Sequence, residues 1–231
     1  MNKNIVAYTL LLSLAAAPAA LAADLAGGTL TGSVAATSDY VFRGVTQTDG
    51  DAAVQAGLTW SHESGIYVSA WGSNVDFNDD ESNLEADFTL GWSGSADNIS
   101  YGASVIYYAY PGVPGGFDYD YVEASANVAI DLGVVKPVAA IYYSPDFFGT
   151  EDDALYLTAG FNAPVTDSLR LFANVGYQDY SSATKDVTDW NAGFVWSVGG
   201  FDVDLRYVDT NAGYLGRLAD ERVVATLSRS F

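Results

Sequence analysis

The sequence predicts an all-β fold, a closed transmembrane β-barrel of about twelve antiparallel strands with both termini on the periplasmic side. Three observations support this prediction. The first residues have the pattern of a leader for export. Polar and apolar residues alternate through most of the sequence that follows, and short turns alternate with longer loops. The alternate apolar side chains would form the outward band with which such strands cross a bilayer.

The first residues have the pattern of a signal peptide. Lys3 supplies a positive charge, residues 5–14 form an apolar run, and residues 20–22 form an Ala-Leu-Ala cleavage pattern. We therefore expect residues 1–22 to be removed and residues 23–231 to form one barrel domain. No later run of about eighteen apolar residues appears, which excludes membrane-spanning helices.

The composition combines a strong acidic excess with many apolar residues. Asp and Glu number 29 against 9 Lys and Arg, giving a formal net charge of -20, while 49% of residues are hydrophobic. Nucleic acid is excluded as a partner because phosphate binding requires basic patches. Cysteine is absent, so the chain has neither disulfides nor a thiolate metal site. A charged surface and an apolar surface must therefore coexist on one chain.

The polar and apolar residues alternate with a period of two. In one segment Leu84, Phe88 and Trp92 occupy one phase, and Glu85 and Asp87 occupy the other. A tilted membrane strand needs about ten residues, and segments of that length recur along the chain. The expected strands are 28–40, 52–62, 65–77, 83–93, 98–110, 118–130, 134–144, 153–163, 167–180, 187–198, 201–211 and 221–231.

The connections between these strands alternate in length, as they do in outer-membrane barrels. The expected periplasmic turns are all short: 61–64, 94–97, 131–133, 164–166 and 199–200. The expected external connections are richer in Gly, Pro and Asp, and most are longer: 41–51, 78–82, 111–117, 145–152, 181–186 and 212–220. A β-sandwich would have no reason to alternate in this way.

The last strand is amphipathic and ends on an aromatic residue. Phe231 is preceded on alternate positions by Leu227, Ala225 and Val223. This ending resembles the signal by which barrel proteins are recognised for assembly, so we expect the barrel assembly machinery as a partner. An outer-membrane location adds outer-membrane lipid and lipopolysaccharide as expected partners. Arg229 lies on the apolar phase, close enough to the periplasmic rim for its head to reach water.

Two segments carry a resemblance to a known family. Residues 38–48 read Ser-Asp-Tyr-Val-Phe-Arg-Gly-Val-Thr-Gln-Thr, and residues 71–77 read Trp-Gly-Ser-Asn-Val-Asp-Phe. Together they resemble the signature of the TorF family of porin-like proteobacterial outer-membrane proteins. The resemblance extends over essentially the whole mature chain, to residues 228–231. It implies an outer-membrane barrel with porin function, and it implies no particular solute.

The sequence offers no set of catalytic residues, and we expect neither an enzyme nor a cofactor. The single histidine, His62, falls in an expected periplasmic turn, without a marked nucleophile and orienting group. Acidic stretches at residues 76–81 and 151–153 lack the spacing of a calcium loop. Solvated external charge, which can contact the anionic outer leaflet through divalent ions, explains them better than a dedicated metal site.

Aromatic residues are expected mainly in girdles at the two membrane interfaces, where an apolar ring and a polar tip are both accommodated. The residues assigned to these girdles are Tyr67, Trp71, Tyr107, Tyr108, Tyr110, Tyr142, Tyr143, Tyr177, Trp196 and Tyr207. An aromatic stack that binds sugars is the alternative.

Charged residues on the inward phase are the candidate pore lining. These are Glu85, Asp87, Glu123, Lys136, Arg170, Asp202, Asp204 and Arg206. The loop at residues 41–51, which carries Arg43, is expected to fold toward the pore mouth as a constriction, because Val41, Phe42 and Val45 would be poorly placed in free solution. Packing of this loop on neighbouring loops is the alternative.

The expected function follows from the size of the barrel and the sign of its inward charge. Strands about 4.8 Å apart and tilted by about 40° enclose a cylinder roughly 24 Å across, which inward side chains narrow to roughly 12 Å. We expect passive diffusion of small hydrophilic solutes or ions, with a modest preference for cations because inward carboxylates outnumber inward basic groups. A non-conducting structural or surface-interaction barrel is the alternative.

Overall fold

A computed structural model describes residues 23–77, 82–113, 119–149, 152–181 and 185–231. The expected signal peptide, residues 1–22, lies outside the described residues. So do parts of the expected loops 78–82, 111–117, 145–152 and 181–186.

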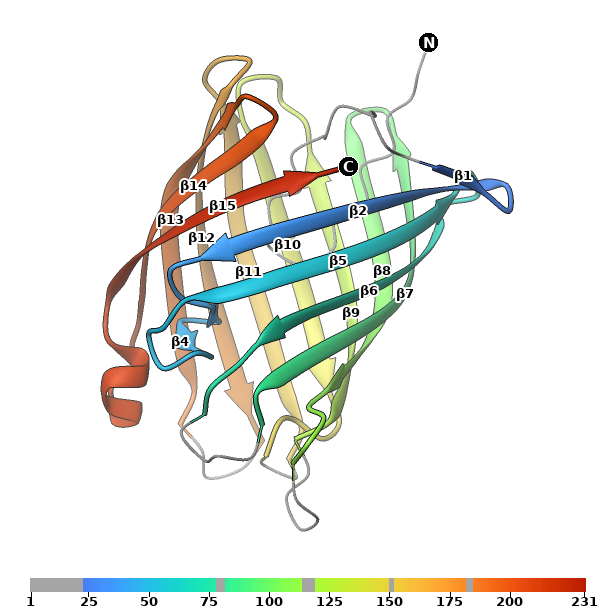
Figure 1. Cartoon of the computed structure of the whole chain (residues 1–231). Coiled ribbons are helices and arrows are strands. Elements are labelled where there is room, and N and C mark those ends of the chain that lie inside the picture. The colour runs from blue at the N-terminus through green and yellow to red at the C-terminus, as the bar shows by residue number, and fades with distance from the viewer. Residues whose placement is uncertain (1–22, 78–81, 114–118, 150–151, 182–184) are drawn as a thin grey trace.

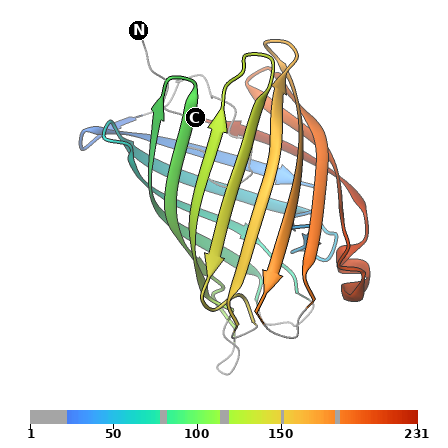
Figure 2. The ribbon, with the colours of Figure 1, turned by 180° about the vertical axis from the view of Figure 1, so that it is seen from behind.

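Twelve of the described strands form one closed antiparallel barrel, as the sequence predicted (Figure 1). They are β2 (Gly28–Thr37), β5 (Ala53–His62), β6 (Ile66–Asn74), β7 (Leu84–Ala96), β8 (Ile99–Ala109), β9 (Tyr121–Ile130), β10 (Lys136–Ser144), β11 (Ala154–Pro164), β12 (Leu169–Tyr180), β13 (Val187–Val198), β14 (Phe201–Thr210) and β15 (Arg222–Ser230). Figure 2 shows the continuous wall from behind. Closure pairs every wall strand on both sides, which a lipid environment requires because it cannot satisfy a free strand edge.

The barrel closes where β15 pairs with β2. Residues 33–37 of β2 pair with residues 226–230 of β15, and Gly32 and Phe231 exchange two backbone hydrogen bonds of 2.7 and 2.9 Å. The remaining edge of β2 is covered by the short strand β1 (Ala23–Leu25), which pairs with residues 28–30. We call this junction between β2 and β15 the seam.

Long loops and short turns lie at opposite ends of the barrel, as expected from the sequence (Figure 1). The turn end also holds β1 and the end of β15. The turn between β13 and β14 consists of Gly199 and Gly200, whose φ angles of 61° and 82° suit a two-residue hairpin turn. At the loop end, a short 3-10 helix, η1 (Gly213–Ala219), precedes β15. Within the described residues, no helix is both long enough and apolar enough to span a bilayer.

The two phases of each strand face different surroundings. On β7, Phe88 and Leu90 are 52% and 59% exposed, whereas Glu85 is 2% exposed. The outward phase of the barrel carries large exposed apolar residues from every wall strand, including Val34, Leu58, Val68, Phe88, Val105, Val122, Ile141, Leu157, Val175, Trp190, Leu205 and Val223. This outward apolar band is the surface that an outer-membrane barrel presents to lipid.

The aromatic residues divide between the two faces, which corrects the expectation that they serve chiefly as girdles. Those that follow the outward phase are Tyr107, Tyr143, Tyr177, Trp196 and Tyr207. Those that do not are Tyr67, Tyr108, Tyr110 and Tyr142, which are buried, and Trp71, which contacts Tyr40 within the barrel. The face that an aromatic residue occupies depends on whether its position is odd or even along the strand, because neighbouring residues such as Tyr107 and Tyr108 point to opposite faces.

Candidate functional site

The loop between β2 and β5 enters the barrel as a small hairpin. Its strands are β3 (Val41–Phe42) and β4 (Val45–Thr46), joined by Arg43 and Gly44 with φ angles of 46° and 82°. Positive φ at both central residues is what a type I′ hairpin turn requires. Gly44 lies so close to the wall that an added Cβ would meet Thr210 at 2.7 Å, so the hairpin tip touches the barrel.

Arg43 at the hairpin tip is held by the barrel wall. Its Nη2 donates to both carboxylate oxygens of Glu123 at 2.9 and 2.8 Å, and its Nη1 donates to Oε1 of Gln178 at 2.7 Å. The side chains of Arg43 and Glu123 are only 9% and 1% exposed. Burial by itself disfavours the charged guanidinium, but the Glu123 carboxylate raises the pKa of Arg43 above its ordinary value. The two residues therefore form a buried, charged pair.

Aromatic rings surround the Arg43 guanidinium. Its central carbon lies 4.1 Å from the ring centre of Tyr156, 5.3 Å from that of Tyr142 and 5.7 Å from that of Phe147. Such distances allow attraction between the cation and the π-electrons of the rings. We use the name cation cage for the residues that the barrel contributes: Glu123, Tyr142, Phe147, Tyr156 and Gln178.

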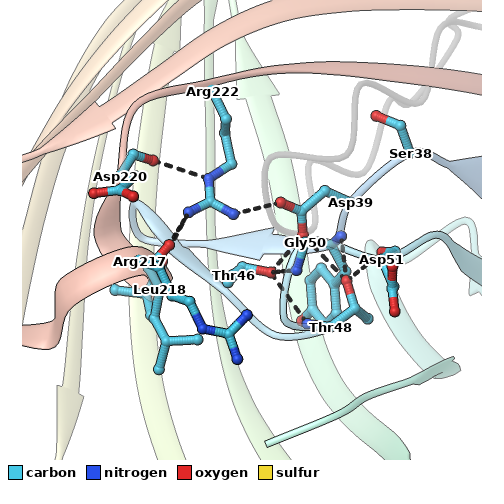
Figure 3. Close-up of polar contacts among 12 residues, drawn as sticks. Ser38, Asp39, Thr46, Thr48, Gly50, Asp51, Arg217, Leu218, Asp220 and Arg222 are labelled. Carbon is cyan, nitrogen blue, oxygen red and sulfur yellow. Dashed lines mark hydrogen bonds and ion pairs between the residues drawn. The ribbon is translucent and has the colours of Figure 1, made fainter.

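The base of the hairpin is fixed by an ion pair across the seam (Figure 3). Nη1 of Arg222, the first residue of β15, donates to Oδ2 of Asp39 at 2.6 Å. The other carboxylate oxygen of Asp39 accepts hydrogen bonds from the hydroxyls of Thr46 and Thr48 at 2.5 and 3.1 Å. We call the Asp39–Arg222 pair the clamp, because it ties the hairpin to the opposite side of the seam.

The clamp is extended by the loop that precedes β15. Arg222 also donates to the carbonyl oxygens of Arg217, Leu218 and Asp220 at 2.9, 3.1 and 3.0 Å. Arg217 in turn pairs with Asp49 at 2.6 Å. One arginine at the start of β15 therefore holds both the inward hairpin and the η1 loop (Figure 3).

The loop end of the lumen beside the hairpin is filled by aromatic side chains. Tyr108 and Tyr121 stack with ring centres 4.2 Å apart, and Phe147 packs on Tyr121 at 5.0 Å. The buried cluster to which these tyrosines belong comprises Val75, Ile106, Tyr108, Tyr110, Tyr121, Tyr142 and Tyr156. The Tyr108 hydroxyl also donates to Glu123 at 3.0 Å, which links this cluster to the cation cage.

A cavity of about 230 Å³ lies within the barrel and is bounded on one side by the hairpin. Much of its remaining lining consists of small hydroxyl and amide side chains from β2, β5, β6, β7, β13 and β15. Its charged lining residues are Asp39, Arg43, Asp87, Asp189, Asp204 and Arg206. Among the described residues, no cluster of acidic or histidine side chains is arranged to hold a metal ion.

Most of the charge in this cavity is compensated locally. Asp204 pairs with Arg206, as Asp39 does with Arg222 and Glu123 with Arg43. Asp87 and Asp189 have no ion-pair partner among the described residues, although Asp189 accepts a hydrogen bond from Tyr156 at 3.0 Å.

The charged residues singled out in the sequence lie on the inward phase, but only some reach the cavity. Those that line it are Asp87, Asp204 and Arg206, together with Arg43 of the hairpin. Glu85 and Glu123 also point inward but are buried by the loop that carries the hairpin: Glu85 accepts a hydrogen bond from the Tyr40 hydroxyl at 3.3 Å, and Glu123 binds Arg43.

The remaining charges of that set lie near the turn end, outside the cavity lining. Lys136 pairs with Asp131 at 3.4 Å, and Arg170 donates to Asn162 at 2.6 Å. Asp202 accepts from the Ser197 hydroxyl. These charges are therefore engaged by neighbours at the rim of the barrel.

Several residues that build the site were missed by sequence reasoning. Asp39, Gln178, Asp189 and Arg222 all hold the hairpin or line the cavity. Gln178 and Asp189 could have been found, because they fall on the inward phase of β12 and β13. The clamp had no local signal, since 183 positions separate its two residues.

The closed sheet, the outward apolar band and the inward loop define the outer-membrane class of β-barrel. Within that class, the chain belongs to the family described as "Bacterial protein of unknown function (Gcw_chp)", whose model matches residues 22–231. No significant match is found among curated protein sequences.

Solved structures with a similar fold include outer-membrane porins and channels. The KdgM porin superposes with a TM-score of 0.61 at 6% identity, covering 87% of this chain and 99% of its own. The same values hold for that porin in complex with disordered oligogalacturonate. An outer membrane channel from Pseudomonas putida F1 gives a TM-score of 0.50 at 12% identity, covering 93% of this chain and 99% of its own. At such low identity the similarity shows the fold alone.

Proposed function

We propose that this chain is a porin-like outer-membrane channel for the passive diffusion of small hydrophilic solutes or ions, with the inward hairpin as its constriction. The observation that carries the proposal is the cavity of about 230 Å³ inside a closed barrel, with its small polar side chains. A polar interior combined with an apolar exterior suits a water-filled path through a membrane. The resemblance of residues 38–48 and 71–77 to the TorF family points the same way, as do the names of the similar structures.

The proposed orientation places the turn end, with β1 and the end of β15, on the periplasmic side, so that both ends of the expected mature chain lie there. Short periplasmic turns and longer external loops are the arrangement of outer-membrane barrels, and both occur here at opposite ends. The outward apolar band would contact lipid, and the acidic loops would face lipopolysaccharide. Phe231, at the turn end of the seam, would then be positioned for recognition by the barrel assembly machinery.

The proposed modest preference for cations rests mainly on two carboxylates. Asp87 and Asp189 line the cavity without an ion-pair partner among the described residues, whereas Arg43 and Arg206 are each paired with a carboxylate. The excess of 29 acidic over 9 basic residues adds a long-range field of the same sign. Glu123 and Asp204, which the sequence suggested as contributors to this cation preference, are each paired with an arginine that offsets their charge.

A second candidate is a non-conducting barrel whose external loops do the work. The observation that favours it is the filling of the loop end of the lumen by the hairpin and the aromatic cluster. Separating a buried ion pair leaves an uncompensated buried charge, which is costly, so a hairpin that stays in place and a permanently plugged barrel fit this geometry.

Single-channel recording of the refolded protein in planar bilayers separates the two candidates. We expect discrete conductance steps from protein that shows heat-modifiable gel migration, the mark of a folded barrel. Silent bilayers with such a folded preparation would overturn the channel proposal and favour the plugged barrel. A preparation unfolded before addition is the matched control for non-specific leakage.

A further inference from the structure

We propose that the cation cage is a guanidinium-binding site of the lumen, which Arg43 occupies in this structure, and that small guanidinium-bearing solutes compete with Arg43 for it. The inference rests on the proposed channel function for the route by which such solutes arrive. It extends that function by naming a solute class and by assigning the hairpin the role of an internal competitor.

No cage residue belongs to the hairpin, because four of them lie on wall strands and Phe147 lies in the loop between β10 and β11. Tyr142 on β10 pairs directly with Tyr156 on β11, and Tyr156 pairs with Gln178 on β12. The sheet register therefore places three cage residues side by side on one inward row. Glu123, from the next strand β9, is held in place by the Tyr108 hydroxyl at 3.0 Å. A site fixed by four adjacent strands is preorganised for its ligand.

The chemistry of the cage matches a guanidinium better than an ammonium. Glu123 and the Gln178 amide oxygen accept from two different nitrogens, Nη2 and Nη1. At the same time the Tyr156 ring lies 4.1 Å from the central carbon of the group. A planar, weakly hydrated cation can stack on a ring while it donates from its edges, whereas an ammonium is compact and strongly hydrated. The expected ligand is therefore a guanidinium group.

The hairpin holds Arg43 in the cage at a conformational disadvantage. Arg43 has a φ of 46°, in the left-handed region that non-glycine residues rarely adopt. The first central position of a type I′ turn favours Asn, Asp or Gly instead. The contacts of the side chain with the cage compensate for this backbone conformation, and a free guanidinium can make the same contacts without it.

The cavity provides a path to the cage. Arg43, Tyr142 and Tyr156 all line the cavity, so a solute that enters it meets the edge of the cage directly. The clamp holds the base of the hairpin at Asp39, which leaves the tip as the part that a competitor would displace. Tethering gives Arg43 an effective concentration in the millimolar range, about that of short flexible linkers, so competition requires solutes at comparable concentrations.

Emptying the cage tests the site directly. Arg43→Ala leaves Glu123 buried and without its cation, so we expect the refolded variant to bind methylguanidine saturably in isothermal titration calorimetry. The affinity should be at least tenfold higher than that of the unsubstituted protein, in which Arg43 must first be displaced. Methylurea, a neutral analogue of similar shape, should not bind. Glu123→Gln added to Arg43→Ala should weaken methylguanidine binding at least tenfold.

Matched controls keep this test decisive. Arg217→Ala also removes an arginine that pairs with a carboxylate, here Asp49, but outside the cage, and should bind methylguanidine no better than the unsubstituted protein. If Arg43→Ala fails to show heat-modifiable migration, Arg43→Gln replaces it, because the amide can still donate to Glu123. Equal binding of methylguanidine and methylurea to the folded variant, or no binding, would overturn the inference.

Conductance separates this inference from the function on which it rests. In the unsubstituted protein, millimolar methylguanidine should change the single-channel conductance, whereas methylurea at the same concentration should not. Methylguanidine binding to Arg43→Ala without any channel activity would contradict the channel proposal and support the guanidinium site. Channels that show neither competition nor methylguanidine binding would support the channel and overturn the site.

Discussion

The loop end and the turn end of the lumen are lined by the same strands, but the inward side chains at the two ends differ in size. On β8 the inward residues change from Tyr108 and Ile106 near the loop end to Ser104 and Gly102 toward the turn end. Ser104 hydrogen-bonds across to Ser125 of β9 at 2.7 Å, with small side chains on both strands. The loop end is therefore packed, and the interior beyond it is polar.

This difference shows that the outward and inward residues of a strand meet different physical requirements. The outward phase is apolar at both ends of the barrel, because lipid surrounds the whole wall. The inward phase instead changes in size and polarity along the barrel, as the residues of β8 show. The outward phase therefore gives the barrel its lipid-facing surface, and the inward phase together with the inward hairpin determines how open the lumen is.

The largest expected effect comes from breaking the buried pair at the loop end. Glu123→Ala leaves the Arg43 guanidinium buried without its carboxylate, which should lower the free energy of unfolding by about 3–5 kcal/mol. Guanidinium-free urea unfolding in detergent, followed by tryptophan fluorescence, measures the change. Glu63→Ala, in an exposed turn, is the control and should leave the stability unchanged. Equal stability of the two variants would show that the pair does not hold the hairpin.

Removal of the clamp should have the next largest effect. Arg222→Ala deletes the 2.6 Å bond to Asp39, and hydrogen bonds to charged groups contribute about 1.5–3 kcal/mol each. We expect faster proteolysis within residues 38–52 while heat-modifiable migration persists. Arg217→Ala removes a more exposed pair, worth about 0–1 kcal/mol, and should change proteolysis little. Identical digestion of both variants would contradict the clamp.

A pair of glycine variants tests the contact between the hairpin and the barrel wall. Gly44 and Gly50 have φ angles of 82° and 88°, so alanine at either position meets a similar backbone cost of about 1–2 kcal/mol. Only at position 44 would the new Cβ also meet the wall, at 2.7 Å from Thr210 and 2.9 Å from Asp189. Gly44→Ala should therefore alter single-channel conductance, and Gly50→Ala should not. The same conductance in both variants would argue against a wedged hairpin.

The smallest expected effect concerns selectivity in the cavity. Asp87→Asn with Asp189→Asn removes the two cavity-lining carboxylates that have no ion-pair partner in the described parts of the chain, so the proposed cation preference should fall modestly. Reversal potentials across a salt gradient measure it, best near 1 M salt, where a Debye length of about 3 Å suppresses the field of the loops. Asp202→Asn, outside the cavity lining, is the control. Anion preference in the unsubstituted protein would refute the assignment.

The wall was predictable from the sequence because its signal is local. Expected strands 187–198 and 52–62 agree with β13 and β5 to within one residue. The expected strand 28–40 was too long at its end, since β2 stops at Thr37, where the chain turns inward toward the hairpin. Residues 38–40 alternate well enough for a strand, so only the tertiary contacts of the hairpin end it.

The contacts inside the lumen were not predictable to the same extent. Arg43 was identified as a residue of an inward loop from its apolar neighbours Val41, Phe42 and Val45. Its partner Glu123 lies 80 positions away and was assigned only to the inward phase. Period-two alternation tells which face a residue occupies, but it contains no information about which loop will reach that face.

The seam is the pairing of the barrel wall that we expect to form last. Every other pairing in the wall joins strands that are neighbours in the sequence, whereas β2 and β15 are separated by nearly the whole chain. Hairpins of neighbouring strands form with little loss of chain entropy, and closure of the long loop has the largest entropic cost. The hydrogen bonds between Gly32 and Phe231 fasten one end of the seam, and the clamp from Asp39 to Arg222 fastens the other. Because Asp39 also begins the hairpin loop, closure of the seam and placement of the hairpin inside the barrel depend on the same ion pair.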